Sequence, residues 1–317
     1  MPQGRGSPSI RVGVVGLGYF GSHHVRHYAA NRAAELVAVV DADEPRALAT
    51  GLRYGVDGLT DHRRLIGRVD AVSIAAPTSL HHAIAADLID AGIHVFVEKP
   101  FAVTVVDAAD LVARAEKADV VLQVGHIERF APAFQSLAKQ VRALKSVACV
   151  RHTPWRGRAA DVDVVLDLMI HDIDLTLALA KAPVIAVEAA GTPVVTGEDD
   201  VVGARLTFDN GVVAALSASR VAAEAERSLT VVETGRRLKA DLSRQTLTVT
   251  PESAEPGTHE FGEADNLAAE VAAFLHAAAT GGQPMVDGRA GLEALRVAEM
   301  IRAAVAAERT RTGVMDG

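Results

Sequence analysis

The first part of the chain alternates short apolar runs with stretches of helical periodicity. The runs are rich in β-branched residues and the stretches between them in Ala and Leu, a pattern typical of βαβ units in a parallel sheet. Because the runs are apolar at successive positions, we expect a doubly wound sheet with helices on both faces. The predicted strands are 11–16, 35–41, 71–77, 94–100 and 120–126, and the predicted helices are 22–31, 44–54, 81–91 and 105–118.

The pattern changes after about Val124. Several strands then follow one another, and two pairs of them flank turn sequences, Asp209-Asn210-Gly211 and Gly235-Arg236-Arg237; Asn-Gly favours the positive φ angles of a tight hairpin. Consecutive hairpins predict an α+β domain with an open, mainly antiparallel sheet. We therefore expect two domains, 1–124 and 125–317. The predicted elements of the second are strands 147–153, 201–208, 212–219, 228–234 and 238–242 and helices 162–180, 266–279 and 288–307.

Composition excludes several classes of protein. The chain has 317 residues, 49% of them hydrophobic, which is ordinary for a globular protein. Its net charge of −8 and its aromatic content of 4% disfavour nucleic acid as a partner. Cys149 is the single cysteine, so a disulfide framework and a multi-cysteine zinc site are both excluded, and we expect it in the core. With no recognisable signal peptide or membrane span, the expected location is the cytoplasm.

A glycine loop between the first predicted strand and helix is the first candidate site. Gly16, Gly18 and Gly21 form the G-x-G-x-x-G pattern, and Asp41 ends the next strand, as expected for a dinucleotide-binding Rossmann fold. The loop, including Tyr19 and Phe20, would bind the cofactor, with the pyrophosphate at the positive helix end. Asp41 would accept hydrogen bonds from the adenine ribose and repel a phosphate there, which favours NAD over NADP. A simple strand-to-helix turn and a methyltransferase are the alternatives.

Two further segments carry candidate catalytic side chains. Lys99 stands at the carboxyl end of a predicted strand, where ligands bind in open α/β sheets, although a solvated surface lysine is the alternative. Asp167 and His171 are four residues apart on one predicted helix face, where the carboxylate could orient the imidazole as a general base. An exposed polar face is the alternative, and we assign Asp172 and Asp174 to such a face or to cap contacts. Their faces diverge from that of His171, so no metal site is expected.

Four separated motifs in this chain resemble those of the Gfo/Idh/MocA oxidoreductases. The resemblance implies a Rossmann domain followed by an open α/β sheet, and NAD-dependent oxidation of a secondary hydroxyl on a sugar or polyol. It also implies that His171 is the general base, that Lys99 binds the reacting oxygen and that Asp167 tunes the pair. The motifs are the glycine loop with Asp41; Ala76-Pro77-Thr78 with His81; Glu98-Lys99-Pro100; and Asp167-x-x-x-His171-Asp172.

The cofactor contacts implied by this resemblance include Ala76, Pro77, Thr78, His81, Glu98 and Lys99. Ala76 and Thr78 differ from the family's usual Thr and Asn. The Lys99-Pro100 bond is often cis in the family, and we predict a cis bond here. We interpret His23, His24 and His27, which follow the glycine loop, as helix surface or domain packing.

Residues 124–134 and the loop 155–158 are similar to the branch of the family that acts on nucleotide-linked amino sugars such as UDP-N-acetylglucosamine. The substrate candidates are His126, Arg129, Arg156, Arg158 and His171. Arginines suit a diphosphate because the guanidinium can bind it bidentately. Alternatively, Arg129 and Arg158 pair with acids such as Glu128 and Asp161.

Other activities of the same fold remain open. They are inositol or other polyol oxidation, glycoside cleavage through transient oxidation, and a sensor that binds NAD without catalysis. An open sheet needs its second face covered, so we expect a homodimer or homotetramer that forms through the second domain.

Overall fold

The computed structural model describes residues 9–157, 160 and 162–313. It contains two compact units, and neither is one continuous stretch of chain. Residues 9–126 cluster with 265–292, and residues 127–264 cluster with 293–313. The sequence pattern predicts 125–317 as one second domain, whereas 265–292 belong to the first unit. Backbone pairing accounts for the return of this segment, since the Val124 N–H donates to the Val286 carbonyl at 3.0 Å.

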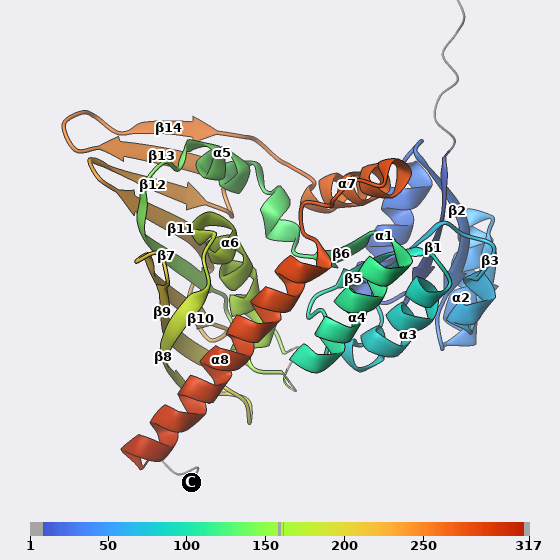
Figure 1. The fold of residues 1–317 in the computed structure, drawn as a ribbon, viewed down its shortest axis with the longest axis horizontal. Coiled ribbons are helices and arrows are strands. Elements are labelled where there is room, and N and C mark those ends of the chain that lie inside the picture. Colours follow the sequence, from blue (N-terminus) through green and yellow to red (C-terminus); the bar gives the residue numbers. More distant parts are fainter. Residues whose placement is uncertain (1–8, 158–159, 161, 314–317) are drawn as a thin grey trace, which may run out of the picture. The chain divides into compact units, whose positions relative to one another are not determined.

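The first unit is a six-stranded parallel sheet in the order β3-β2-β1-β4-β5-β6, which confirms the expected doubly wound fold (Figure 1). The strands are β1 (Ile10–Val15), β2 (Ala34–Val40), β3 (Asp57–Leu59), β4 (Ala71–Ile74), β5 (His94–Glu98) and β6 (Leu122–Gly125). The helices are α1 (Tyr19–Ala30), α2 (Glu44–Tyr54), the 3-10 turn η1 (His62–Leu65), α3 (Thr78–Asp90), α4 (Val105–Ala118) and α7 (Asn266–Thr280).

Local chemistry sets the helix boundaries in this unit. Side-chain oxygens of Asp43, Thr104 and Asp265 accept backbone N–H groups at the starts of α2, α4 and α7, the arrangement expected of N-caps. The core between sheet and helices holds Tyr28 and Phe96 with almost no exposed surface. Phe96 also packs edge-on against Phe274 of α7, with ring centroids 5.7 Å apart.

The second unit has an eight-stranded sheet in the order β14-β13-β12-β11-β7-β10-β9-β8. Every neighbouring pair is antiparallel except β7 and β10, which confirms the open, mainly antiparallel sheet. The strands are β7 (Leu144–His152), β8 (Val184–Thr192), β9 (Val201–Phe208), β10 (Val213–Ser219), β11 (Glu226–Glu233), β12 (Arg236–Asp241), β13 (Thr246–Pro251) and β14 (Gly257–Glu260). The helical segments are η2 (Ile127–Phe130), α5 (Pro132–Gln140), the π-helical turn η3 (Val165–Met169), α6 (Ile170–Ala180) and α8 (Gly288–Thr312), which begins in the first unit.

One face of this sheet is packed and the other is open. Helices α5 and α6 contact the same face of the sheet (Figure 1). Cys149 of β7 points into that core with 1% of its surface exposed, between its register partners Leu216 and Leu229, which confirms its predicted core position. The alternate residues Ala148 and Ala215 are exposed on the opposite face, so the described residues of this unit leave that face uncovered.

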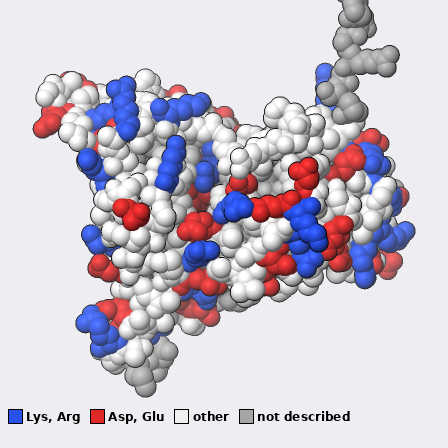
Figure 2. All heavy atoms as spheres, in the orientation of Figure 1, with Lys and Arg blue, Asp and Glu red and all other residues white. Residues whose placement is uncertain are grey.

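Charged side chains are distributed without large single-sign areas on the face shown in Figure 2, where acidic and basic groups are intermixed. Among the described helices, none combines the length and apolar character needed to cross a membrane.

Candidate functional site

The glycine loop between β1 and α1 requires a glycine at two of its positions for two different reasons. Gly16 has φ of +86°, and a Cβ there would lie 2.6 Å from the backbone of Ala75. A Cβ on Gly21 would overlap the Gly16 carbonyl oxygen. Gly18, by contrast, has nothing within 4 Å of its Cβ position. The backbone at Gly18 is therefore open to a ligand, as binding of a pyrophosphate at the start of α1 requires.

Asp41 lies directly after β2, beside this loop. Its carboxylate accepts the Leu17 N–H at 2.7 Å and the Asp43 N–H at 2.9 Å, and the Arg46 guanidinium lies 3.3 Å away. Burial alone would raise the pKa of Asp41, but the two N–H groups and Arg46 outweigh burial and lower it. Asp41 is thus held as a charged acceptor at the carboxyl edge of the sheet, where ribose hydroxyls could bind.

Two aromatic side chains of the loop face solvent in this chain. Tyr19 is 69% exposed and Phe20 is 42% exposed. Their rings pack edge to face, with the ring centroids 5.3 Å apart. Large exposed aromatics beside an open backbone position are consistent with a surface that a cofactor covers.

His81 connects the loop after β4 to the turn after β5. Its side chain is almost fully buried, with Nε2 2.8 Å from the Ala76 carbonyl and Nδ1 3.0 Å from the Pro100 carbonyl. Burial lowers the pKa of His81 although these carbonyl contacts oppose the shift. The Lys99-Pro100 bond is cis, as predicted. His81 therefore fixes the two loops that carry the predicted cofactor contacts Ala76, Pro77, Thr78 and Lys99.

Glu98 faces into the first unit, and its partner is a residue that the sequence analysis did not assign to the site. Its carboxylate is 2.8 Å from Nε2 of the fully buried His24 and accepts the Lys99 backbone N–H at 3.3 Å. The His24 ring also packs edge-on against Phe96, with centroids 4.9 Å apart. The sequence did contain a signal for this position: Gly21, His24 and Tyr28 have the spacing of one helix face, and that face is the buried one. His24 thus connects the helix of the glycine loop to the strand that ends at Lys99.

The predicted helix 162–180 is not a continuous α-helix. Residues Val165–Met169 form a π-helical turn, and α6 begins at Ile170. Asp163 accepts the N–H groups of Val165 and Leu166 at 3.0 and 3.1 Å, which anchors the start of the turn. Asp167 lies in this turn and the half-buried His171 lies in the first turn of α6. Turns of this kind are frequent at functional sites, and the pairing of Asp167 with His171 stays a prediction.

We predicted Asp172 and Asp174 on an exposed face or in cap contacts, and that prediction is wrong. Both are buried, and each binds an arginine. Asp174 accepts two hydrogen bonds from Arg129, at 2.6 and 2.9 Å. Asp172 accepts two from Arg151, at 2.8 and 3.1 Å. Arg151 is not predicted from the sequence, because nothing in an isolated strand sequence shows which acid an arginine will contact.

The remaining substrate candidates occupy different environments. Arg129 pairs with Asp174 rather than with Glu128, and its role as a substrate ligand stays a prediction. His126 follows β6 and is buried, whereas Arg156 is exposed. Arg158 and its expected partner Asp161 lie outside the described residues.

Both halves of the chain match family models. Residues 10–126 match a model described as an oxidoreductase family with an NAD-binding Rossmann fold. Residues 134–239 match a model described as the GFO/IDH/MocA C-terminal domain.

Individual relatives extend over nearly the whole chain. UDP-N-acetylglucosamine 3-dehydrogenase from Acidithiobacillus ferrooxidans is 36% identical over 94% of this chain and 98% of its own. Its solved structure superposes with a TM-score of 0.90 over the same shares of the two chains. Myo-inositol 2-dehydrogenase from Thermotoga maritima is 28% identical, covering 90% of this chain and 93% of its own. A levoglucosan dehydrogenase solved with NADH and levoglucosan shares the fold at a TM-score of 0.85 and 21% identity, covering 95% of this chain and 98% of its own.

Proposed function

Because this chain belongs to the Gfo/Idh/MocA family of NAD-binding oxidoreductases, we propose that it oxidises a hydroxyl of a nucleotide-linked amino sugar. The best candidate is the 3-hydroxyl of UDP-N-acetylglucosamine. The observation that carries this choice is the 36% identity to UDP-N-acetylglucosamine 3-dehydrogenase along 94% of the chain.

In this proposal the first unit binds the cofactor. The open backbone at Gly18 would receive the pyrophosphate, and Asp41 would accept the ribose hydroxyls. NAD, when bound, supplies the nicotinamide ring that accepts a hydride from the carbon of the alcohol. Lys99 would donate a hydrogen bond to the reacting oxygen and stabilise its developing charge. Its support is the position of Lys99 directly after β5, at the sheet edge that also carries the glycine loop and Asp41.

The second unit would supply the base. His171 would take the proton from the hydroxyl as the hydride leaves, and Asp167 would orient the imidazole. This assignment is supported by their four-residue spacing, which is close to one turn of an α-helix or of a π-helix, so that both side chains project toward the same side of the segment. Asp172 is already bound by Arg151 and is not proposed to move a proton.

The proposal is tested by incubating the purified protein with NAD and UDP-N-acetylglucosamine and recording NADH absorbance. We expect NADH to form, and myo-inositol and glucose assayed in parallel to give far slower rates. NADH from myo-inositol but not from the nucleotide sugar would make this a polyol dehydrogenase, as the Thermotoga maritima relative is named. Binding of NAD without oxidation of any of these compounds would favour a sensor.

A further inference from the structure

The second unit contains a group of buried charges around α6 that the proposed reaction does not use. Its members are Glu128, Arg129, Arg151, Asp172 and Asp174, which we call the α6 clamp. At most 14% of any of these side chains is exposed. Each positive member contacts negative ones: Arg151 binds both Glu128 and Asp172, and Arg129 binds Asp174.

The clamp residues bind α6 on two sides. Asp172 is bound to Arg151 of β7, and Asp174 is bound to Arg129 of η2. Successive residues of an α-helix are about 100° apart, so these two carboxylates project about 200° apart around the axis. Each is held by two parallel hydrogen bonds. Such forked contacts restrict direction as well as distance, so together they fix the rotation of α6 about its own axis.

The two halves of the clamp are joined to each other. Glu128 and Arg129 are adjacent in η2, and Glu128 accepts a hydrogen bond from Arg151 at 2.7 Å. Burial alone would lower the pKa of Arg151, but Asp172 and Glu128 outweigh burial and raise it, so the guanidinium stays charged. The strand β7, the turn η2 and the helix α6 are therefore connected through one set of charged side chains.

Stability alone is a weak explanation for such a group. Burying charges costs desolvation energy that their attraction only partly offsets, and apolar side chains of similar size often stabilise a protein equally well. An apolar contact, however, permits a helix to rotate or slide more readily than a forked pair does. His171 precedes Asp172 by one residue and so projects from the arc of α6 between the two gripped sides.

We propose that Arg151 and Arg129 are positioning residues that fix the rotation of α6 and thereby the direction of the His171 imidazole. The inference rests on the proposed function for the role of His171 as base, but the positioning itself concerns only this unit. Arg129 is in this reading a structural partner of Asp174 and not a ligand of the substrate's diphosphate.

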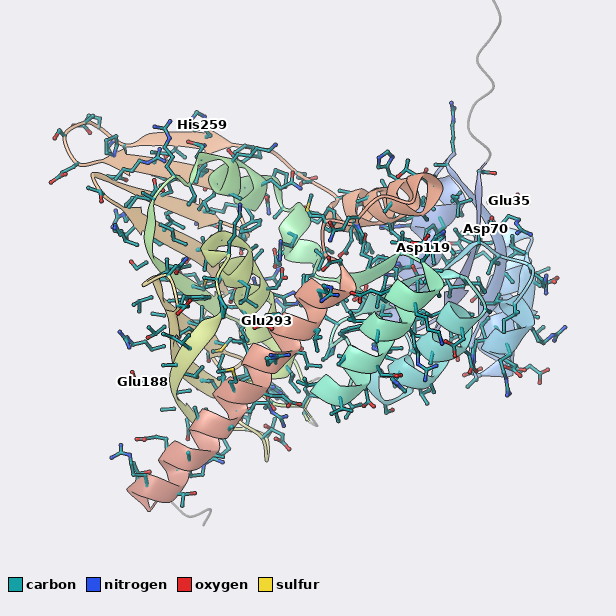
Figure 3. The ribbon with its side chains drawn as sticks, viewed as in Figure 1. Glu35, Asp70, Asp119, Glu188, His259 and Glu293 are labelled. Atoms are coloured by element: carbon teal, nitrogen blue, oxygen red, sulfur yellow. The ribbon has the colours of Figure 1, made fainter. Side chains whose placement is uncertain are left out.

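The first test compares Arg151→Lys with the double variant Arg129→Met/Asp174→Leu. Lysine keeps the charge but cannot form the forked contact, and the double variant removes both charges of one pair without leaving either unpaired. Arg205→Met is the matched control, because Arg205 pairs with the exposed Glu188 (labelled in Figure 3) on strands of the same sheet. We expect kcat to fall on the order of tenfold to a hundredfold in both clamp variants, with KM for the sugar and Kd for NAD unchanged and no effect of the control.

Whether kcat or KM changes decides if Arg129 positions α6 or binds the substrate. A rise in KM for the nucleotide sugar with kcat unchanged in the double variant would make Arg129 a substrate ligand and overturn the inference. Wild-type kcat in the two clamp variants would also overturn it.

A second measurement needs no substrate. Diethyl pyrocarbonate modifies exposed imidazoles, and mass spectrometry reports the rate at His171 alone. We expect this rate to change severalfold in Arg151→Lys and in the double variant and to stay at the wild-type value in Arg205→Met. If the wild-type enzyme oxidises no sugar, the proposed function fails while this rate still tests the clamp. An unchanged rate in both clamp variants would refute positioning.

Discussion

Asp41 combines two tasks in one side chain. It holds the glycine loop through Leu17 and presents charge where the adenine ribose would lie. We predict that Asp41→Ala weakens NAD binding by about tenfold or more, because the ribose would lose one or two hydrogen bonds to a charged group. NADP should lose less affinity, because the half-exposed Arg46 remains to attract a phosphate.

Fluorescence titration with each cofactor checks this prediction. Glu35→Ala is a suitable control, because Glu35 is an exposed carboxylate elsewhere on β2 (Figure 3). Unchanged affinity of Asp41→Ala for both cofactors would remove Asp41 from the ribose site.

Lys99 and His171 can be separated from cofactor binding by substitution. We predict that Lys99→Met and His171→Ala each lower kcat by about a hundredfold or more, because each removes a group that acts on the reacting hydroxyl. NAD titration should show Kd near the wild-type value in both. A variant with normal turnover of the nucleotide sugar would end the catalytic role of that residue.

The buried pair of His24 and Glu98 makes a different prediction. In His24→Leu the Glu98 carboxylate loses its 2.8 Å partner, and an unsatisfied buried acceptor costs about 1–3 kcal/mol. The free energy of unfolding, measured with urea, should fall by that amount. His27→Leu on the same helix should cost less, because its contact with Asp265 is longer, at 3.6 Å, and that carboxylate is half exposed. Equal losses in the two variants would contradict the importance of the pair.

At the scale of elements, Asp200 controls the loop between β8 and β9. It is fully buried and accepts the N–H groups of Val194, Val195 and Thr196. Burial alone would raise the pKa of Asp200, but these bonds outweigh it and lower the pKa in the folded protein. The stabilisation is therefore complete above the unfolded-state pKa, near 4, and is lost as the pH falls through the lower folded value.

We predict that Asp200→Asn lowers the free energy of unfolding at pH 7 on the order of 2–3 kcal/mol, because the loop N–H groups lose a charged acceptor. The difference from wild type should begin to shrink as the pH falls below about 4, where the carboxylate of the unfolded wild type becomes neutral, and should be lost as the pH falls through the lower folded-state pKa. Urea denaturation of both proteins at a series of pH values measures this difference in the free energy of unfolding. A difference that does not depend on pH would show that the charge of Asp200 is not responsible.

Most long elements were predictable from sequence, and the exceptions have physical reasons. Apolar runs identified five strands of each sheet, and Asn210-Gly211 identified the β9–β10 hairpin, in which Gly211 has φ of +82°. The pattern missed β3, which has three residues, and β8 and β14, which have no buried residue. It also missed β13, which has one buried residue, and the helix α5. Hydrophobic periodicity also cannot distinguish a π-helical turn from an α-helical one, because their apolar faces nearly coincide.

The candidate site was predictable only in part for a related reason. Glycine spacing and a strand-end acid identify a dinucleotide loop because the chemistry lies within one stretch of sequence. Pairs such as Arg151 with Asp172 join residues far apart in the chain. Which residues form such pairs can be identified only in the folded structure, after the strands and helices have packed together.

At the scale of the molecule, the uncovered face of the second sheet suggests assembly. We propose that copies of this chain associate through it, since Ala148 and Ala215 are exposed register partners at its centre. Ala215→Arg should shift the mass measured by light scattering toward that of the monomer, because a buried unpaired charge is costly at an interface. Leu52→Arg adds the same charge at an exposed position of α2, in the first unit, and should leave the mass unchanged. A monomeric wild-type protein would refute the proposal.

The return of residues 265–292 to the first unit has a consequence for the order of synthesis. The strand β6 and the ring of Phe96 meet partners, Val286 and Phe274, that leave the ribosome only after the entire second sheet has been made. Domains commonly fold one after another as the chain emerges. Here the nascent first unit must wait for most of translation with an apolar surface uncovered, so it is the part of this protein that a chaperone would be expected to protect.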